Sequence, residues 1–168
     1  MAKLPIVTVG APVLEQRAVE VPKITKKVTK LIDDMLETMY EANGIGLAAP
    51  QVGVSQRIIV LDPGEEGPIV LVNPEITVAS GEEIDVEGCL SIPDRWVYVK
   101  RHTAVEVTGW NEKGKTVRME AEGLLARALQ HEIDHLDGIL MLERMLAEAV
   151  PAEDGGPVDD EAEEEVGE

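Results

Sequence analysis

HEIDHLDG, residues 131–138, contains two histidines four positions apart, with a glutamate directly after the first. Residues at positions i and i+4 lie on one face of an α-helix, so His131 and His135 could bind a single metal ion. Glu132 would lie beside that ion, where a carboxylate can act as a base. H-E-x-x-H is a known metal-binding spacing, and it favours a metal site over a pair of histidines on the surface of a helix.

The residues around this motif predict a helix from about Ala121 to Leu136, which Gly138 ends. Four apolar residues lead to the histidines at helical spacing, and they predict the inner face of this helix. These residues are Leu124, Leu125, Ala128 and Leu129. The two histidines would continue that face.

A second helix is predicted from Pro22 to Asn43, where apolar residues recur at helical spacing and form one stripe. Pro22 suits the first turn, and Asn43-Gly44 supplies a C-terminal stop. Between the two helices, β-rich segments predict strands, the last two joined by a hairpin turn at NEKG (111–114). The segments are RIIVLD (57–62), PIVLVNP (68–74), EITVAS (75–80), RWVYVKR (95–101), AVEVTGW (104–110) and KTVRME (115–120).

The composition is that of a globular protein. With 168 residues, of which 44% are hydrophobic and 29% charged, the chain can bury a core without disulfides or a structural metal. Its one cysteine excludes an intramolecular disulfide, which fits a reducing compartment. The sequence has neither the apolar core of a signal peptide nor a run of membrane-spanning length. We therefore expect a cytoplasmic protein without a membrane partner.

The negative charge is divided equally between two parts of the chain. Residues 151–168 hold nine acids and no base, so they carry half of the net charge of −18. Low hydrophobicity, proline, glycine and acid runs are typical of disorder, which predicts one domain over 1–150 and a disordered acidic tail. The domain has no basic stripe, so direct binding to nucleic acid is not expected.

The only cysteine lies in EGCLS, residues 87–91. A single cysteine is usually a small buried hydrophobic residue. Here Gly88 permits a close backbone approach, and Cys89 follows EEIDVE (82–87), whose alternation resembles a strand edge. One thiolate and two imidazoles would leave one tetrahedral position open for water, and the chain offers no obvious fourth ligand.

GIGLAAPQVG, residues 44–53, contains two glycines in a G-x-G spacing. A dinucleotide-binding loop is excluded because the segment follows a helix instead of a strand and the third glycine is misplaced. The simplest alternative is a turn that leads into the next strand. Gln51, however, is polar within a segment otherwise fit for burial, and such a group usually has a specific partner.

The three segments GIGLAAPQ, EGCLS and HEIDH, in this order, resemble the motifs of the peptide deformylases. The resemblance covers residues 1–150. It implies an α+β fold in which antiparallel strands pack around a central metal-binding helix. It also implies an enzyme that removes the N-formyl group from new polypeptides that begin with formyl-methionine, releasing formate.

The resemblance also assigns roles to residues. Cys89, His131 and His135 would bind one divalent metal per chain, with Fe²⁺ expected in the cell and Zn²⁺, Ni²⁺ or Co²⁺ accepted. Glu132 would take a proton from the attacking water and deliver it to the leaving amine. The side-chain amide of Gln51 and the backbone N–H of Leu90 would stabilise the oxyanion.

The peptide would bind along exposed backbone next to the metal. Gly44, Gly46 and Gly88 would let the substrate pair as an added strand. Ile45, Leu124 and Ala128 would line the pocket for the methionine side chain.

The sequence departs from the family pattern in three places. Arg127 lies one helical turn before His131, where its stem could line the methionine pocket while its head reaches solvent. Trp96 replaces a basic residue that steadies the substrate in some relatives. The acidic tail would be repelled by RNA, so any association with the ribosome would not use it.

Two alternatives share part of this evidence. A metallopeptidase uses the same H-E-x-x-H motif, but position 141, where the longer motif of one class has histidine, is Met141. A non-enzymatic metal-binding module would have no need of Glu132 or Gln51.

Overall fold

A computed structural model describes residues 3–64 and 67–149. The predicted acidic tail, 151–168, lies outside these residues. The described chain forms two antiparallel sheets, with strand orders β1-β2-β3-β6-β7 and β4-β5-β8. Their strands are β1 (Gly46–Ala48), β2 (Ile58–Leu61), β3 (Ile69–Ser80), β4 (Glu83–Cys89), β5 (Ile92–Arg101), β6 (Ala104–Trp110), β7 (Thr116–Glu122) and β8 (Met145–Glu148).

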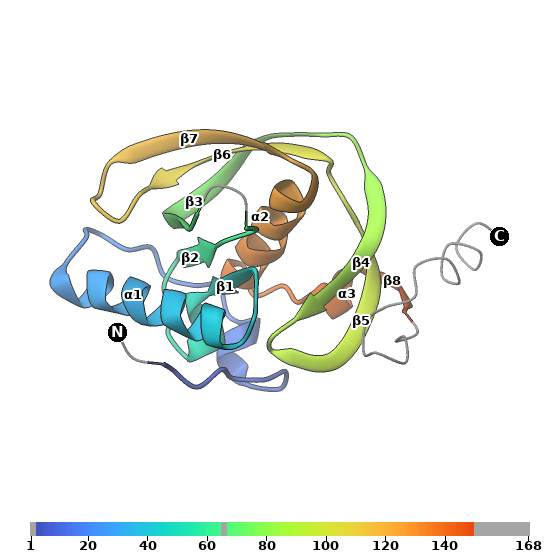
Figure 1. The fold of residues 1–168 in the computed structure, drawn as a ribbon, viewed down its shortest axis with the longest axis horizontal. Coiled ribbons are helices and arrows are strands. Elements are labelled where there is room, and N and C mark those ends of the chain that lie inside the picture. Colours follow the sequence, from blue (N-terminus) through green and yellow to red (C-terminus); the bar gives the residue numbers. More distant parts are fainter. Residues whose placement is uncertain (1–2, 65–66, 150–168) are drawn as a thin grey trace.

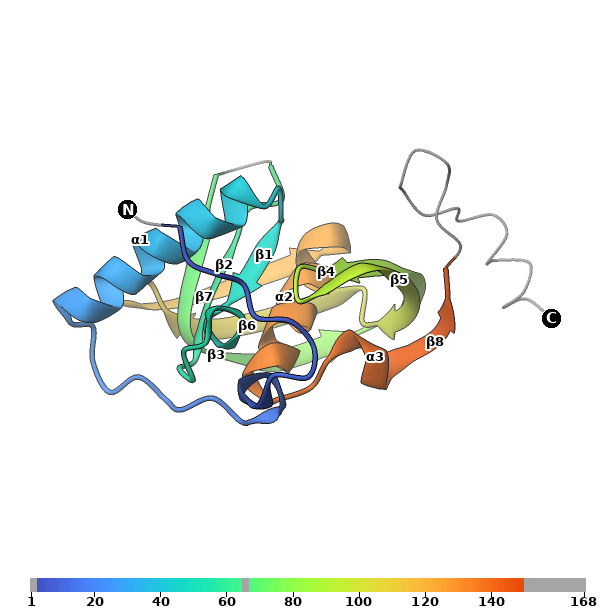
Figure 2. The same cartoon turned by 90° about the horizontal axis from the view of Figure 1, so that it is seen from below.

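The helix that carries HEIDH, α2 (Gly123–Leu136), lies at the centre of the molecule between the two sheets (Figure 1). The described residues form four other helical elements, and the longest of them lies towards the outside in the view of Figure 2. They are the 3-10 turns η1 (Pro12–Glu15) and η2 (Ala49–Val52), the helix α1 (Lys26–Glu41) and the short helix α3 (Met141–Arg144). Antiparallel strands packed around a central helix are the α+β arrangement that the resemblance implies, and the structure confirms it.

The central helix is buried along most of its length because its apolar side chains pack against the five-stranded sheet. Ala126, Leu129, Ile133 and Leu136 pack in one core cluster with residues of that sheet, which include Ile59, Leu61, Leu71 and Val107. Removing one such leucine side chain from water contributes about 1.5–3 kcal/mol. Every residue from 126 to 136 is buried, the charged ones included.

The start of this helix differs from the prediction. Strand β7 continues to Glu122, so Ala121 belongs to the strand and the helix begins at Gly123. Gly123 has a φ of 60°, a left-handed conformation that allows the sharp turn from strand to helix. Leu124 therefore lies in the first turn with 55% of its surface exposed, and it is not part of the inner face.

Helix α1 covers the outer side of β1 and β2 with its predicted apolar stripe. Val28, Ile32, Met35 and Met39 are buried there together with residues of the two strands. The helix begins later than predicted because Thr25 is its N-cap and accepts a hydrogen bond from the Val28 N–H. Pro22 consequently precedes the helix. The stop is confirmed, since Asn43 has a φ of 58° and the Gly44 N–H donates to the Met39 carbonyl.

The hairpin turn at 111–114 is confirmed by a hydrogen bond from the Gly114 N–H to the Asn111 carbonyl. The predicted strands 68–74 and 75–80 form one strand, β3, whose pairing with β6 shifts register between Val72 and Glu75. Within the described residues, no helix is long and apolar enough to cross a membrane.

Candidate active site

The three predicted metal ligands meet at the point where the end of β4 faces α2. The donor atoms of Cys89, His131 and His135 all lie within 4.8 Å of one another. Cys89 Sγ is 3.3 Å from His135 Nε2. In a tetrahedral site with metal–sulfur and metal–nitrogen distances of about 2.3 and 2.1 Å, the sulfur and nitrogen are about 3.6 Å apart. The donor set and its spacing therefore fit one divalent metal ion.

The ring of His131 is oriented by a carboxylate. His131 Nδ1 lies 2.9 Å from Glu87 Oε1, so the Nε2 atom is left for the metal side of the ring. Burial tends to raise the pKa of Glu87, but hydrogen bonds from Arg101 and His131 outweigh it and lower that pKa strongly. Glu87 is thus an ionised acceptor, and the Nδ1–H of His131 donates to it.

The two histidines differ in their affinity for a proton. Burial tends to lower the pKa of His131, but hydrogen bonds with Cys89 and Glu87 and the charge of Glu132 raise it well above its ordinary value. Burial, with the nearby charges of His131 and Arg101, lowers the pKa of His135 well below its ordinary value. The surroundings of His131 therefore favour a positive charge, which a proton supplies without metal and which a bound divalent cation would supply in place of that proton, whereas His135 is held neutral and ready to act as a ligand.

Glu132 is buried next to these ligands, and its Oε1 atom has no hydrogen-bond partner among the described residues. Burial raises the pKa of Glu132 to about 7. A buried carboxyl group without a partner is costly to the fold, and such groups are typical of functional sites. A Cβ at Gly46 would lie 2.6 Å from Glu132 Oε2, so the backbone of β1 closes on this carboxyl group.

Gln51 has the specific partners that its sequence context predicts. Its Oε1 accepts a hydrogen bond of 2.9 Å from the Ala48 N–H. Its Nε2 donates to Ser91 Oγ at 3.1 Å and lies 3.6 Å from Cys89 Sγ. The side-chain oxygen is thereby fixed away from the ligands, and the N–H₂ group is directed towards them.

These groups line a cavity of about 480 Å³, a volume typical of small-ligand sites. The cavity surface is formed by all the predicted site residues except His135, which lies behind them and is almost fully buried. The predicted peptide-binding residues in this surface are Gly44, Ile45, Gly46, Gly88, Leu124 and Ala128.

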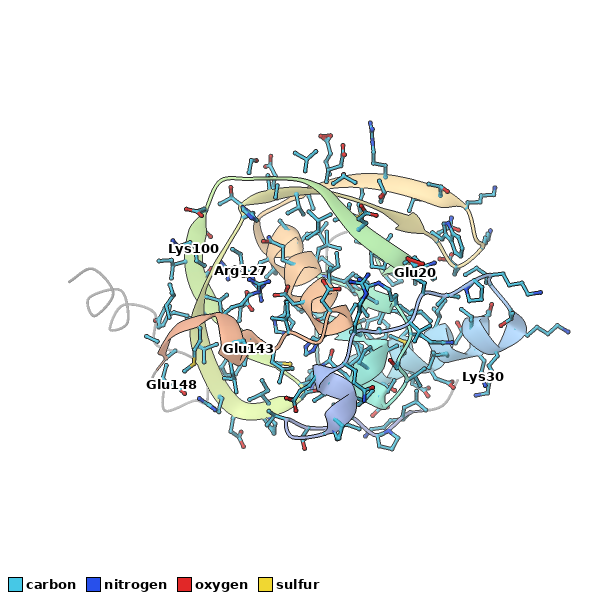
Figure 3. All side chains as sticks on the ribbon, turned by 180° about the vertical axis from the view of Figure 1, so that it is seen from behind. Glu20, Lys30, Lys100, Arg127, Glu143 and Glu148 are labelled. Carbon is cyan, nitrogen blue, oxygen red and sulfur yellow. The ribbon has the colours of Figure 1, made fainter. Side chains whose placement is uncertain are left out.

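The expectation that the Arg127 head reaches solvent is wrong. Only 8% of Arg127 is exposed, and Figure 3 shows it between α2 and the strands of the three-stranded sheet. Its guanidinium donates to Glu87 Oε2 at 2.8 Å and to the carbonyls of Val99 and Glu83 at 3.0 and 2.8 Å. Arg127 therefore supports the carboxylate that orients His131.

The sequence interpretation missed the other members of this buried ionic network. Arg101 donates to both carboxylate oxygens of Glu87 and to Asp134 Oδ2. Arg144 of α3 makes two further hydrogen bonds to Asp134. The available signal was Glu87 itself, an acid two residues before Cys89, a spacing that places two side chains on one face of a regular strand.

An α+β fold with a donor set that fits one metal ion, and with a buried glutamate beside it, fits the class of metal-dependent hydrolases. Residues 3–149 match the family described as polypeptide deformylase. The chain belongs to the polypeptide deformylase family. It is thus an enzyme that hydrolyses the N-formyl group from newly made polypeptides.

Curated relatives and solved structures agree with this assignment. The chain is 53% identical to the peptide deformylase of Pelotomaculum thermopropionicum over 92% of this chain and 100% of that protein. It is 56% identical to the peptide deformylase of Halothermothrix orenii over 87% and 96% of the two chains. The crystal structure of the Thermotoga maritima peptide deformylase matches with a TM-score of 0.84 and 44% identity, over 86% of this chain and 99% of that chain.

Proposed function

We propose that the chain performs deformylation with Cys89, His131 and His135 holding one divalent cation. The convergence of these three donors beside Glu132, in a cavity, is the observation that carries this proposal. A bound divalent cation supplies Lewis-acid activation of a water molecule and of the formyl carbonyl. The remaining steps are performed by side chains and backbone groups of the chain.

Glu132 accepts the proton of the attacking water and transfers it to the peptide nitrogen. The water oxygen bonds to the formyl carbon, the carbon–nitrogen bond breaks, and formate leaves while the protonated nitrogen becomes the new amino terminus. The position of Glu132 supports this role, because it is buried next to a ligand and its Oε1 has no partner among the described residues.

Gln51 and Leu90 stabilise the negative charge that develops on the formyl oxygen. The Ala48 N–H holds the side-chain oxygen of Gln51, so the N–H₂ group is oriented before the substrate arrives. Leu90 follows Cys89 directly and lines the same cavity, which supports its backbone N–H as the second donor. Donors that need no reorganisation contribute most to such stabilisation.

The peptide binds between two sheet edges. Strand β1 is the edge of the five-stranded sheet and β4 is the edge of the three-stranded sheet, and residues of both line the cavity. An extended peptide can pair with such an edge through its backbone, at Gly44 and Gly46 on one side and Gly88 on the other. Ile45, Leu124 and Ala128 receive the methionine side chain.

The chain uses Fe²⁺ in the cell, as its resemblance to the deformylases implies, and it also accepts Zn²⁺, Ni²⁺ or Co²⁺, because a thiolate and two imidazoles suit these ions as well. It acts in the cytoplasm, where formylated chains are made. The acidic tail excludes ribosome association through that segment, and the net charge of −18 disfavours direct binding to nucleic acid.

The test is formate release from formyl-Met-Ala by the full chain, with cleavage of an unformylated peptide as the comparison. We expect formate and no peptide-bond cleavage. Glu132→Gln should keep its metal and lose about 10²–10⁴-fold in turnover. Cys89→Ser should lose metal as measured by elemental analysis, because an alcohol is a poorer anionic ligand than a thiolate.

Two results would overturn the assigned roles. Turnover within a few-fold of the parent in Glu132→Gln would exclude this glutamate as the base. A full complement of tightly held metal in Cys89→Ser would exclude the thiolate from the ligand set.

A further inference from the structure

We propose that Trp96 selects the second residue of the formylated peptide, so that this chain prefers a large apolar or aromatic side chain directly after the methionine. The inference rests on the deformylase function and the peptide geometry proposed above. It adds to that function a preference among newly made polypeptides according to their second residue.

Trp96 lies in β5 on the face of the three-stranded sheet that points away from α2. Side chains of a strand alternate between faces. Val97 and Val99 are fully buried on the inner face, whereas Trp96 and Tyr98 belong to a separate small apolar cluster. Val86 of β4, which pairs with Tyr98, is part of that cluster.

The ring of Trp96 nevertheless reaches the active-site cavity, because it lies over a glycine. A Cβ at Gly88 would lie 2.4 Å from the Cζ3 atom of the ring and within 3.0 Å of two further ring atoms. Neighbouring strands are about 4.8 Å apart, and the ring crosses that distance only because β4 has no side chain here. Trp96 is consequently part of the cavity surface.

The alternation of an extended peptide decides which of its residues meets this ring. When the methionine side chain points towards α2, where Leu124 and Ala128 line the cavity, the next side chain points to the opposite face of the added strand. That face is the one on which the Trp96 ring covers Gly88. The second residue of the peptide therefore contacts Trp96.

The chemistry of this surface favours apolar partners. The Trp96 ring and Val86 both line the cavity on this side, and both are partly exposed. An apolar or aromatic side chain would remove this surface from water and could stack on the ring. Glycine would leave the surface exposed, and glutamate would lose hydration without gaining a partner on the ring.

The experiment measures kcat/KM for formyl-Met-X-Ser peptides with X as Phe, Leu, Gly or Glu. It uses the full metal-loaded chain, Trp96→Ala, Trp96→Phe, and Trp110→Phe as the matched control. Trp110 is the only other tryptophan, and it lies in β6, outside the cavity surface. We expect the parent to favour Phe over Gly by about tenfold. The ratio of kcat/KM for the Phe peptide to that for the Gly peptide should drop to about twofold or less in Trp96→Ala. It should be intermediate in Trp96→Phe and keep the parent value in Trp110→Phe.

Equal values for all four peptides in the parent would overturn the inference, as would an undiminished preference for Phe in Trp96→Ala. Absence of formate from every peptide would instead contradict the proposed function. If Trp96→Ala does not fold, tryptophan fluorescence of the Trp110→Phe variant tests the inference instead, because Trp96 is the only tryptophan in that variant. A saturable change with the product Met-Phe-Ser that exceeds the change with Met-Gly-Ser supports the inference, and equal responses contradict it.

Discussion

At Gly46, the absence of a side chain allows the backbone of β1 to lie against the carboxyl group of Glu132, the proposed base. A Cβ at Gly46 would lie 2.6 Å from Glu132 Oε2 and 3.1 Å from the Cγ and Cδ atoms. The backbone of β1 therefore limits the positions of the Glu132 side chain on one side. A role in substrate pairing alone would not require this contact.

We predict that Gly46→Ala leaves the fold and the metal content intact but lowers kcat about 10²-fold, because the carboxyl group must move by about an ångström. Its effect on KM should be smaller. The double variant with Glu132→Gln should be no slower than Glu132→Gln alone, because the two changes then remove the same function. A rise in KM at constant kcat would show that Gly46 acts only through the peptide.

The closeness of His131, Glu132 and His135 could be predicted from the sequence, but the distance between Gly46 and Glu132 could not. His131, Glu132 and His135 are local neighbours on one helix, so their spacing alone determines their relation. Gly46 reaches Glu132 from a strand that lies far away in the sequence, and only the packing of β1 against α2 brings them together. The same reason hid the contact between Gly88 and Trp96, because it depends on strand pairing.

At the scale of elements, a buried ionic network joins the central helix to the three-stranded sheet. Arg127 and Asp134 of α2 are bonded to Glu87 of β4 and Arg101 of β5. A buried charge that loses its partner destabilises a protein strongly, whereas an exposed ion pair contributes little. The network therefore fixes where α2 lies relative to the strand that ends in Cys89.

We predict that Arg127→Met lowers the free energy of unfolding by about 3 kcal/mol, measured by denaturant unfolding. The loss includes the hydrogen bonds to two backbone carbonyls. Arg118→Met is the matched control, since Arg118 forms an exposed ion pair with Glu106, and it should cost less than about 1 kcal/mol. Equal costs for the two substitutions would show that the network is not what holds the helix.

The local sequence predicts where helices and strands form, but it does not predict which of them pair or how strands continue into one another. The apolar stripe of α1 and the hairpin of β6 and β7 were predictable because each pattern lies within one segment. The sequence predicts two strands, 68–74 and 75–80, where the structure has the single strand β3, in which Asn73 adopts a φ of 53° and its side chain bonds the backbone of Val21. Strand β3 thus accommodates Pro74 at a β-bulge, where its pairing with β6 shifts register. Strand β8 has no recognisable pattern of its own and exists because it pairs with β5.

At the scale of the whole molecule, half of the net negative charge follows the last described residue, Ala149, in the sequence. The Ala149 N–H donates to the carbonyl of Trp96 at 2.8 Å, so the chain leads into its acidic segment beside a residue of the cavity surface. Residues 151–168 carry nine acids and no base. Negative charge close to a binding cleft attracts cationic ligands and repels anionic ones.

We therefore predict that formylated peptides with lysine at the fourth and fifth positions have a larger kcat/KM than those with glutamate there, by about three- to tenfold at low salt. The ratio should approach one at about 1 M salt, where screening shortens the range of charge interactions to about 3 Å. A full-length variant with the nine acids of 151–168 changed to Asn or Gln should show a smaller ratio at low salt, and an uncharged peptide should be insensitive to salt. A lysine-to-glutamate ratio that changes neither with salt nor with the neutralised segment would contradict this prediction. The preference would then come from contacts inside the cavity and not from the electrostatic field of the whole molecule.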